Sequence, residues 1–385
     1  MAEDVLWERD LHQRGSGRTL AVGGDCVVVH ERWTRLVCLE RQDGRVRWDA
    51  PFGLWPRSVV VHGDRCYGIA QNVDALTCWD VRTGAVLWTV PLPRFTGYLT
   101  AVDDTVLVGG WRGYTDLTAL DADTGQVRWS TFGRPATVHP LAVGQGVLVA
   151  APDGDEVRLL DVRDGQVLRC WTLPEPLRSQ DYAQIFTRAG SDRILAPCGR
   201  RTVVELRPDT GDLRTLLRHD RDLAPVRARV AGGLLWVWDT AGCAAYDPED
   251  GAPRWRVDLR QRLAPGVVAV GDGYVLGGDQ GTLLRLDRAG RVARRTSVSR
   301  RIAAVRGAGP TEDPDILEGS GEPVGVAQPQ HPVAPTGRRV GGPGDQSRVT
   351  GPELGRGLRG AADEGVQVRV GQDGGHLLGV LDPQG

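Results

Sequence analysis

The sequence contains no lysine, no basic cluster and no long apolar run. All 47 basic residues of the 385-residue chain are arginines, scattered along the sequence and balanced by 49 acidic residues, so the net charge is −2. A nucleic-acid-binding surface needs clustered positive charge. A membrane-spanning helix needs roughly 18 consecutive apolar residues. We therefore expect neither a nucleic-acid partner nor a membrane segment.

Paired cysteines and a secretion signal are also lacking. The seven cysteines include no adjacent pair and no Cys-x-x-Cys, a pattern that suits a reducing compartment better than a disulfide framework. The N-terminal residues MAEDVLWERDLHQR are acidic and have no apolar core, unlike a secretory signal. Both features predict a cytoplasmic protein.

No catalytic or metal-binding signature is present. The seven histidines are dispersed, without His-x-His or His-Glu-x-x-His spacing, and neither Gly-x-Ser-x-Gly nor a phosphate-binding loop occurs. The equivalent Cys38 and Cys78 fit small buried side chains better than a reactive pair. We therefore predict no catalytic residue, no metal site and no cofactor.

The sequence does contain an internal repeat, which is clearest in LTALDADTGQVRW (117–129). An apolar run ends in Asp121, a Thr-Gly turn follows, and Trp129 stands four residues after Gly125. The turn glycine recurs about every 40 residues, a spacing typical of repeat architectures. Its copies are Gly44, Gly84, Gly125, Gly165, Gly211, Gly251 and Gly290.

Each unit reads as four short strands. In the second unit, RSVVV, RCYGIA, ALTCWD and AVLWTV are separated by Gly or Asp turns. Alternating β-branched and aromatic residues with frequent turns indicate an all-β protein, and no window shows a sustained helical period. Units of about 40 residues with four strands predict a β-propeller.

The recurring residues have structural interpretations. The glycine supplies the positive φ of a tight turn, and an Asp four residues earlier (Asp80, Asp121, Asp161 or Asp247) can bond the turn amides. A tryptophan after the turn can pack against the next unit. These tryptophans are Trp7, Trp48, Trp88, Trp129 and Trp255, whereas units four, five and seven have Arg169, Thr215 and Arg294 and should pack differently.

The two ends of the chain predict how the ring closes. Residues 5–11, VLWERDL, read as a fourth strand without its first three, and 365–385 read as a second and third strand ending at the turn glycine Gly385. We therefore predict eight blades, the last completed by both termini, with a seven-unit ring and a loose tail as the alternative. Residues 5–299 form the first seven blades and the closing strand, 300–355 a disordered Pro/Gly/Arg-rich insertion, and 356–385 strands of the final blade.

The phrase LDxxTGxVxW resembles the repeat of the pyrroloquinoline-quinone (PQQ) propeller superfamily, with ALDADTGQVRW (119–129) and CWDVRTGAVLW (78–88) as the closest matches. The resemblance covers residues 5–299 and about 357–385. It implies either a quinoprotein alcohol dehydrogenase, with PQQ, calcium, a catalytic aspartate and adjacent bonded cysteines, or a binding platform. This chain has no adjacent cysteines, and none of its residues maps onto that catalytic set.

Loop composition suggests where a partner would bind. The first and third turns of each unit are short, whereas the second turns and the links between units are longer and hold Trp33, Trp55, Trp111 and Tyr114. Exposed aromatic residues often anchor interfaces. We hypothesise a monomeric, non-enzymatic scaffold for protein interaction or ligand sensing. Aromatic residues that merely cover blade edges, a PQQ-dependent dehydrogenase, or a hydrolase or lyase acting at the central funnel remain alternatives.

Overall fold

The computed structural model describes most of the chain up to residue 307 and two C-terminal strands. The described residues are 5–12, 20–54, 56–70, 72–110, 115–131, 139–177, 185–239, 241–259, 263–278, 281–297, 302–307, 366–370 and 376–380. The chain divides into two compact units, Met1–Ser320 with Asp363–Gly385, and Gly321–Ala362. All described residues belong to the first unit, which is the subject below.

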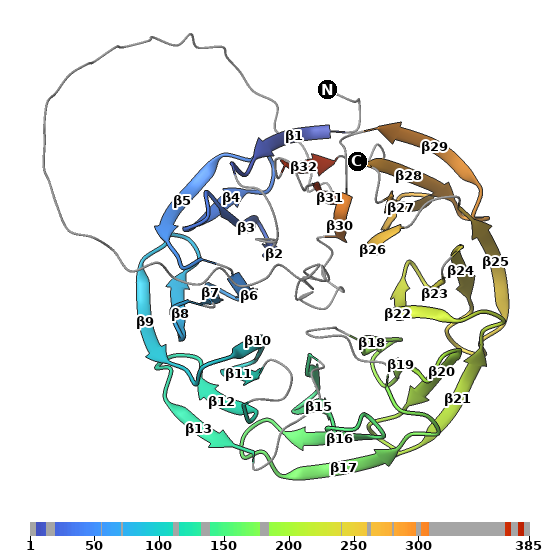
Figure 1. The fold of residues 1–385 in the computed structure, drawn as a ribbon, viewed down its shortest axis with the longest axis horizontal. Coiled ribbons are helices and arrows are strands. Elements are labelled where there is room, and N and C mark those ends of the chain that lie inside the picture. The colour runs from blue at the N-terminus through green and yellow to red at the C-terminus, as the bar shows by residue number, and fades with distance from the viewer. Residues whose placement is uncertain are drawn as a thin grey trace, which may run out of the picture. The chain divides into compact units, whose positions relative to one another are not determined.

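The described residues form eight sheets of four antiparallel strands and no helix, and the sheets follow one another around a ring (Figure 1). Blade 1 contains β2 (Leu20–Val22), β3 (Cys26–Glu31), β4 (Arg35–Glu40) and β5 (Val46–Pro51). Blade 2 contains β6 (Pro56–His62), β7 (Arg65–Ala70), β8 (Ala75–Asp80) and β9 (Val86–Pro91). Blade 3 contains β10 (Thr96–Val102), β11 (Thr105–Gly110), β12 (Thr118–Asp121) and β13 (Val127–Ser130). Blade 4 contains β14 (Leu141–Val143), β15 (Gly146–Ala150), β16 (Glu156–Asp161) and β17 (Val167–Thr172).

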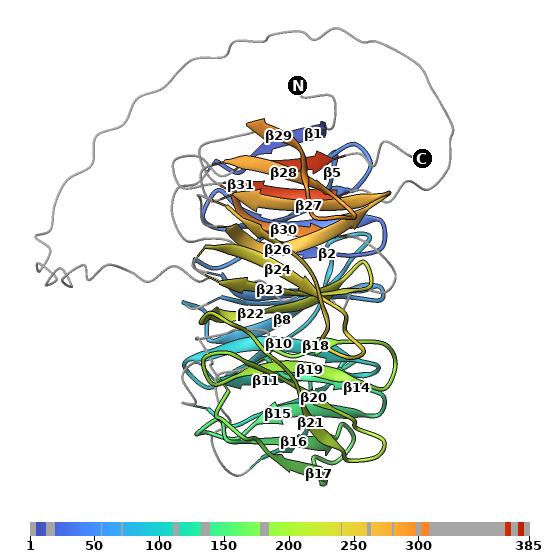
Figure 2. The ribbon, with the colours of Figure 1, turned by 90° about the vertical axis from the view of Figure 1, so that its right-hand side faces the viewer.

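The second half of the ring continues in the same way, and its sheets are stacked in chain order in Figure 2. Blade 5 contains β18 (Thr187–Arg188), β19 (Ile194–Cys198), β20 (Thr202–Leu206) and β21 (Leu213–Arg218). Blade 6 contains β22 (Leu223–Ala231), β23 (Leu234–Asp239), β24 (Gly242–Tyr246) and β25 (Pro253–Asp258). Blade 7 contains β26 (Leu263–Val270), β27 (Gly273–Gly278), β28 (Thr282–Asp287) and β29 (Val292–Ser297).

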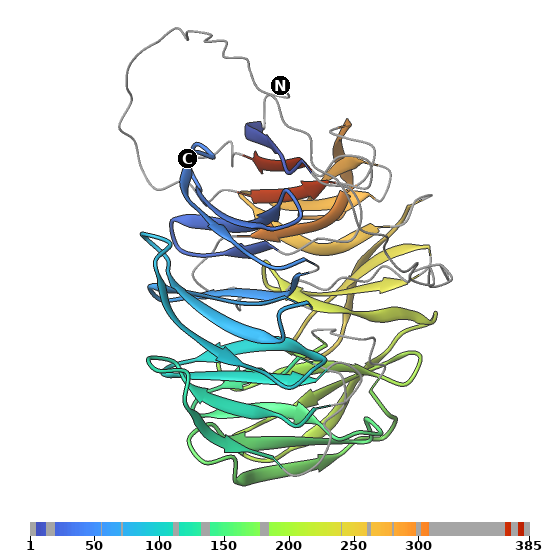
Figure 3. The ribbon, with the colours of Figure 1, turned by 60° about the vertical axis from the view of Figure 1, so that its left-hand side comes forward.

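Blade 8 is assembled from both ends of the chain. Its order is β30 (Ile302–Gly307), β31 (Val366–Val370), β32 (His376–Val380) and β1 (Val5–Asp10), and β1 pairs antiparallel with β32 (Figure 3). The predicted all-β propeller, closed by its N-terminal strand, is confirmed with eight sheets among the described residues. The first strand, β30, lies inside the segment predicted as an insertion, so the boundary at residue 300 was placed too early. Residues 308–355 and Gly385 lie outside the described residues.

The core is divided into hydrophobic clusters between neighbouring blades. Successive side chains of a strand point to opposite faces of its sheet. On β3, Val27 and Val29 therefore belong to the cluster that contains Trp7 of blade 8, whereas Cys26 and Val28 belong to the cluster shared with blade 2. Strands buried on both faces explain the nearly continuous apolar runs in the sequence.

The third turn of each blade has the geometry that its sequence predicts. Gly125 has φ +72°, and a Cβ atom there would lie 2.8 Å from Cε3 of Trp88. Asp121 Oδ1 accepts hydrogen bonds from the N–H groups of Asp123 (3.0 Å) and Thr124 (2.8 Å). Hydrogen bonds from Arg128 and Thr124 lower the pKa of Asp121 to about 2. Asp80, Asp161 and Asp247 also accept bonds from turn amides, so the predicted bracing role is confirmed.

The tryptophans join each blade to the next. The indole Nε1 of Trp7, Trp48, Trp88 and Trp129 donates to a backbone carbonyl of the following third turn, at Arg41, Val81, Ala122 and Val162 respectively, over 2.7–3.0 Å. Trp255 instead packs its ring on Gly290, and its Nε1 has no acceptor among the described residues.

Blade 4 shows how a junction is made without tryptophan at the usual place. Arg169 lies over Gly211 and donates to the carbonyl of Asp209 (2.5 Å). Trp171, two residues further along β17, donates to the carbonyl of Gly211 (2.9 Å). The indole bond is thus kept from a shifted position, as expected for a junction that packs differently.

Candidate binding face

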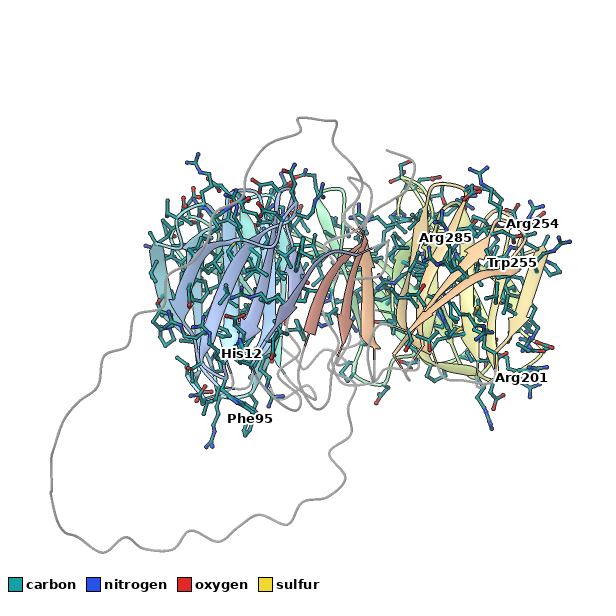
Figure 4. The ribbon with its side chains drawn as sticks, turned by 90° about the horizontal axis from the view of Figure 1, so that it is seen from above. His12, Phe95, Arg201, Arg254, Trp255 and Arg285 are labelled. Carbon is teal, nitrogen blue, oxygen red and sulfur yellow. The ribbon has the colours of Figure 1, made fainter. Side chains whose placement is uncertain are left out.

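The propeller presents two unlike faces. In a four-stranded meander the first and third turns lie on one face, and the second turns and the links between blades lie on the other, here called the second-turn face. Figure 4 shows His12, Phe95 and Arg201, which belong to links or second turns, on one side and Arg254 on the opposite side. The face predicted to bind a partner is therefore the one that carries Phe95.

Only one of the four predicted interface residues can be placed. Trp33 lies in the second turn of blade 1, and its side chain is 41% exposed. Trp55, Trp111 and Tyr114 lie outside the described residues. The interface role of all four residues remains a prediction.

Backbone geometry marks the same face. Six non-glycine residues of the described chain have positive φ, and five belong to links or second turns: His12, Arg32, Trp33, Asp74 and Phe95. Positive φ is uncommon outside glycine and is unfavourable for bulky side chains such as Trp33 (φ +65°) and Phe95 (φ +71°). Such conformations persist where the surroundings enforce them and are concentrated at functional sites.

Charged side chains hold the turn that carries Trp33. Glu31, at the end of β3, is buried and receives two bonds from Arg9 of β1 and one from Arg32 (3.0 Å). Asp49 on β5 contacts Arg32 and accepts a bond from Arg35 Nε (2.6 Å). Burial raises the pKa of Asp49, but the two guanidinium groups outweigh it and lower the pKa overall. The turn is therefore held by side chains of its own blade and by Arg9 of blade 8.

Phe95 was not among the predicted residues. It lies in the link between β9 and β10, is 39% exposed, and has the guanidinium of Arg94 5.3 Å from its ring centroid. Thr96, which follows it, bonds the carbonyl of Pro93 through its hydroxyl (2.7 Å). A phenylalanine in a link, in a chain with only four phenylalanines, was the signal that could have identified it.

A buried polar group at the junction of blades 5 and 6 resembles catalytic machinery in composition only. His219 contacts the Tyr246 hydroxyl through Nδ1 (2.5 Å) and Asp239 Oδ2 through Nε2 (3.1 Å). Asp239 Oδ1 also accepts the N–H groups of Ala241 (2.7 Å) and Gly242 (3.0 Å). The side chains of His219 and Asp239 are 0% and 1% exposed, so a substrate cannot reach them. The group stabilises the junction.

The described residues do not fit the cofactor set that the family resemblance implies. They include no group of three or more His, Cys, Asp or Glu side chains able to hold a metal ion. Six of the seven free cysteines are buried, and no two are adjacent in sequence. No helix of the described chain is long and apolar enough to span a membrane.

Sequence comparison identifies the family. A family model described as outer membrane protein assembly factor BamB matches residues 2–75, 73–222 and 239–320, more than half of the chain. The chain belongs to this BamB family of PQQ-like repeats. BamB of Burkholderia pseudomallei (strain K96243) is 26% identical over 142 residues, which are 36% of this chain and 36% of that protein. The match thus spans about a third of that BamB.

Solved structures show the fold alone, since their identities are low. BamB from Moraxella catarrhalis has a TM-score of 0.63 and 17% identity, covering 78% of this chain and 93% of that chain. Quinohemoprotein alcohol dehydrogenase from Comamonas testosteroni has a TM-score of 0.67 and 12% identity, covering 98% and 76%. Saccharomyces cerevisiae Sqt1 has a TM-score of 0.69 and 10% identity, covering 100% of both chains. BamB, Sqt1 and a quinohemoprotein alcohol dehydrogenase therefore share this architecture with the BamB-family chain.

The family match corrects the predicted location. The cytoplasmic localisation inferred from the cysteines and the N-terminal residues is wrong, because the matched family is described as an assembly factor of the outer membrane. Unpaired cysteines report on redox environment only weakly when they are buried, as six of the seven are here.

Proposed function

We propose that this BamB-family propeller binds a partner protein on its second-turn face, around the turn of Trp33 and the link of Phe95. The observation that carries the proposal is that both residues expose large aromatic side chains from left-handed backbone. Glycine or asparagine would adopt this backbone more readily. An exposed aromatic residue kept there at a conformational cost favours a role in recognition.

The chemistry of the face supports a protein partner. Tryptophan and phenylalanine supply contact area at low side-chain entropy, and arginine is enriched beside them in interfaces. Arg94 and Arg32 flank the two aromatic residues in sequence. The relatives are described as protein assembly factors, which also favours a protein over a small molecule.

Affinity purification with a matched control tests the proposal. The tagged protein is compared with Trp33→Asn/Phe95→Asn and with Val127→Asn, which changes an exposed apolar residue beside the third turn of blade 3. A protein recovered by the parent and by Val127→Asn but lost from the double variant supports the proposal. Recovery of the same proteins by all three would reject this face as the binding surface.

A further inference from the structure

The outer strand of blade 2 differs from all the other outer strands. Every propeller blade ends in a strand whose outer edge has unpaired backbone groups, and natural sheets protect such edges with charged residues. Seven of the eight outer strands here carry at least one charge: β1, β5, β13, β17, β21, β25 and β29. The sequence of β9, VLWTVP, carries none.

The edge of β9 offers hydrogen-bonding groups to a further strand. Leu92 N–H bonds the carbonyl of Asp74 (2.9 Å), which makes these residues a hydrogen-bonded pair of the ladder with β8. Hydrogen-bonded and non-hydrogen-bonded pairs alternate along an antiparallel ladder. Counting back from Leu92, Val90 is a hydrogen-bonded position and Thr89 is a non-hydrogen-bonded one. Thr89 therefore directs its N–H and C=O away from β8, toward the open edge. Its hydroxyl bond to Thr77, its partner on β8 (3.3 Å), agrees with that placement. Pro91 lacks an N–H group and limits pairing to the residues before it.

Comparison with blades 1 and 3 shows what β9 is missing. Arg47 of β5 bonds both Glu40 (2.7 Å) and Asp25 (2.8 Å). Arg128 of β13 bonds both Asp121 and Asp104, each at 2.7 Å. Each arginine stands three residues after its turn glycine, and the acids lie at the end of the third strand and the start of the second. We call each of these sets, one arginine of the outer strand bonded to two acidic residues, a clamp.

Blade 2 has both acids of this clamp but no arginine. Asp80 and Asp64 occupy the two acidic positions, whereas Leu87 replaces the arginine and is 48% exposed. Asp64 lies 3.7 Å from Arg65 Nε, and Asp80 Oδ1 accepts bonds from the turn residues Arg82 and Thr83. The outer strand of this blade, unlike those of blades 1 and 3, supplies no guanidinium to either carboxylate. The unpaired edge of β9 and the two acidic residues together indicate the chemistry of a segment that could bind here.

We propose that β9 accepts an extended segment of a partner protein as a fifth, antiparallel strand, with apolar side chains along it and an arginine at its C-terminal end. An antiparallel addition places that end beside Val86 and the third turn. An arginine at the C-terminal end of the added strand would lie two strands away from Asp80 on β8. Arg128 on β13 spans the same number of strands when it bonds Asp104, which directly precedes β11. Backbone bonds supply affinity in such strand addition, and the guanidinium sets direction and register.

A synthetic peptide probe and a matched pair of variants test this inference. The probe is the blocked, fluorescently labelled peptide Ser-Val-Thr-Val-Thr-Val-Arg, followed by anisotropy, with Glu in place of Arg as the control peptide. Leu87→Arg restores the residue found at the same position of blades 1 and 3, so it should fold. Leu168→Arg makes the same change on β17, which already carries Arg169 and where Leu168 is 51% exposed.

The inference expects saturable binding to the parent protein, retained by Leu168→Arg and weakened about tenfold or more by Leu87→Arg and by the Glu peptide. Hydrogen exchange at the Thr89 amide should slow when the probe saturates the protein. No saturable binding at about 1 mM peptide, or equal binding to Leu87→Arg, would overturn it. A concentration-dependent dimer of the parent that Leu87→Arg dissociates would also overturn it, because the occupant would then be a second copy. Trp33→Asn/Phe95→Asn should bind the probe normally, so this result is independent of the second-turn face.

Discussion

Arg9 of β1 and Glu31 of β3 form a two-bond ion pair that ties the last blade to the first, with Nε–Oε2 2.8 Å and Nη2–Oε1 2.9 Å. Trp7, two residues earlier, donates to the carbonyl of Arg41 and packs on Gly44. The N-terminal strand thus closes the ring through its ladder with β32, an ion pair and an indole. The three contacts come from only six residues of sequence.

Glu31→Gln should destabilise the ring by about 2 kcal/mol, because Arg9 and Arg32 would lose a buried carboxylate while Arg9 keeps some solvent contact. Deleting residues 1–11 should cost more, since blade 8 then loses its outer strand. Urea denaturation measures both effects. Asp153→Asn, at an exposed turn residue, is the control. Identical midpoints for parent and deletion would contradict closure by β1.

Trp129→Phe should cost about 1 kcal/mol more than Trp255→Phe. Both changes remove a similar volume beside a turn glycine, but only Trp129 loses a hydrogen bond, from Nε1 to the carbonyl of Val162 (2.8 Å). The Nε1 of Trp255 has no acceptor among the described residues. The difference between the two free energies of unfolding isolates the indole bond. Equal costs would mean that packing alone joins the blades.

The fold could be predicted because its determinants are local and repeated. A positive φ at Gly125, a carboxylate brace at Asp121 and an indole at Trp129 all lie within nine residues, and the sequence repeats them. Two features were not predicted because they depart from this repeated local pattern. Trp171 is displaced by two residues from the repeat, and β30, IAAVRG, is a short strand beside a Pro- and Gly-rich stretch whose composition dominates the window.

The candidate binding face could be described from the sequence only in outline. Loop length and aromatic content identified Trp33, but the left-handed backbone of Trp33 and Phe95 has no sequence signal, because glycine or asparagine usually marks such positions. The pairing of Arg9 with Glu31 depends on which blades meet when the ring closes. The sequence shows that β9 carries no charge. The significance of this absence depends on the ion pairs that Arg47 and Arg128 form in blades 1 and 3, which only the structure shows.

Acid should weaken blade 5 through Glu205, whose side chain is 1% exposed and lies 2.7 Å from Arg214 Nη2 and 2.9 Å from Arg207 Nε. Burial raises the pKa of Glu205, but the arginines outweigh it, so the folded-state pKa lies below its ordinary value. A lowered pKa stabilises the folded state above the unfolded-state pKa of about 4.3, and this stabilisation is lost as the pH falls below it.

The variant Glu205→Gln should therefore lose about 3 kcal/mol near neutral pH, because three arginines including Arg193 would face an uncharged side chain. It should also show a smaller loss of stability than the parent between about pH 6 and pH 3. Urea denaturation across that range measures both quantities, with Asp153→Asn, at an exposed turn residue outside this cluster, as the control. A parallel pH profile in Glu205→Gln and the parent would show that other carboxylates govern acid unfolding.

Trp33→Asn should separate binding from stability. The second turn of blade 1 holds this residue at φ +65°, which asparagine adopts more readily than tryptophan, and the exposed indole contributes little burial. The free energy of unfolding should therefore stay the same or rise by about 1 kcal/mol. Partner recovery should fall, because the aromatic contact is gone. Trp129→Phe is the opposite case, destabilised with binding intact. A large loss of stability in Trp33→Asn would instead mean that the indole packs against its own blade, and the left-handed turn would then serve folding rather than recognition.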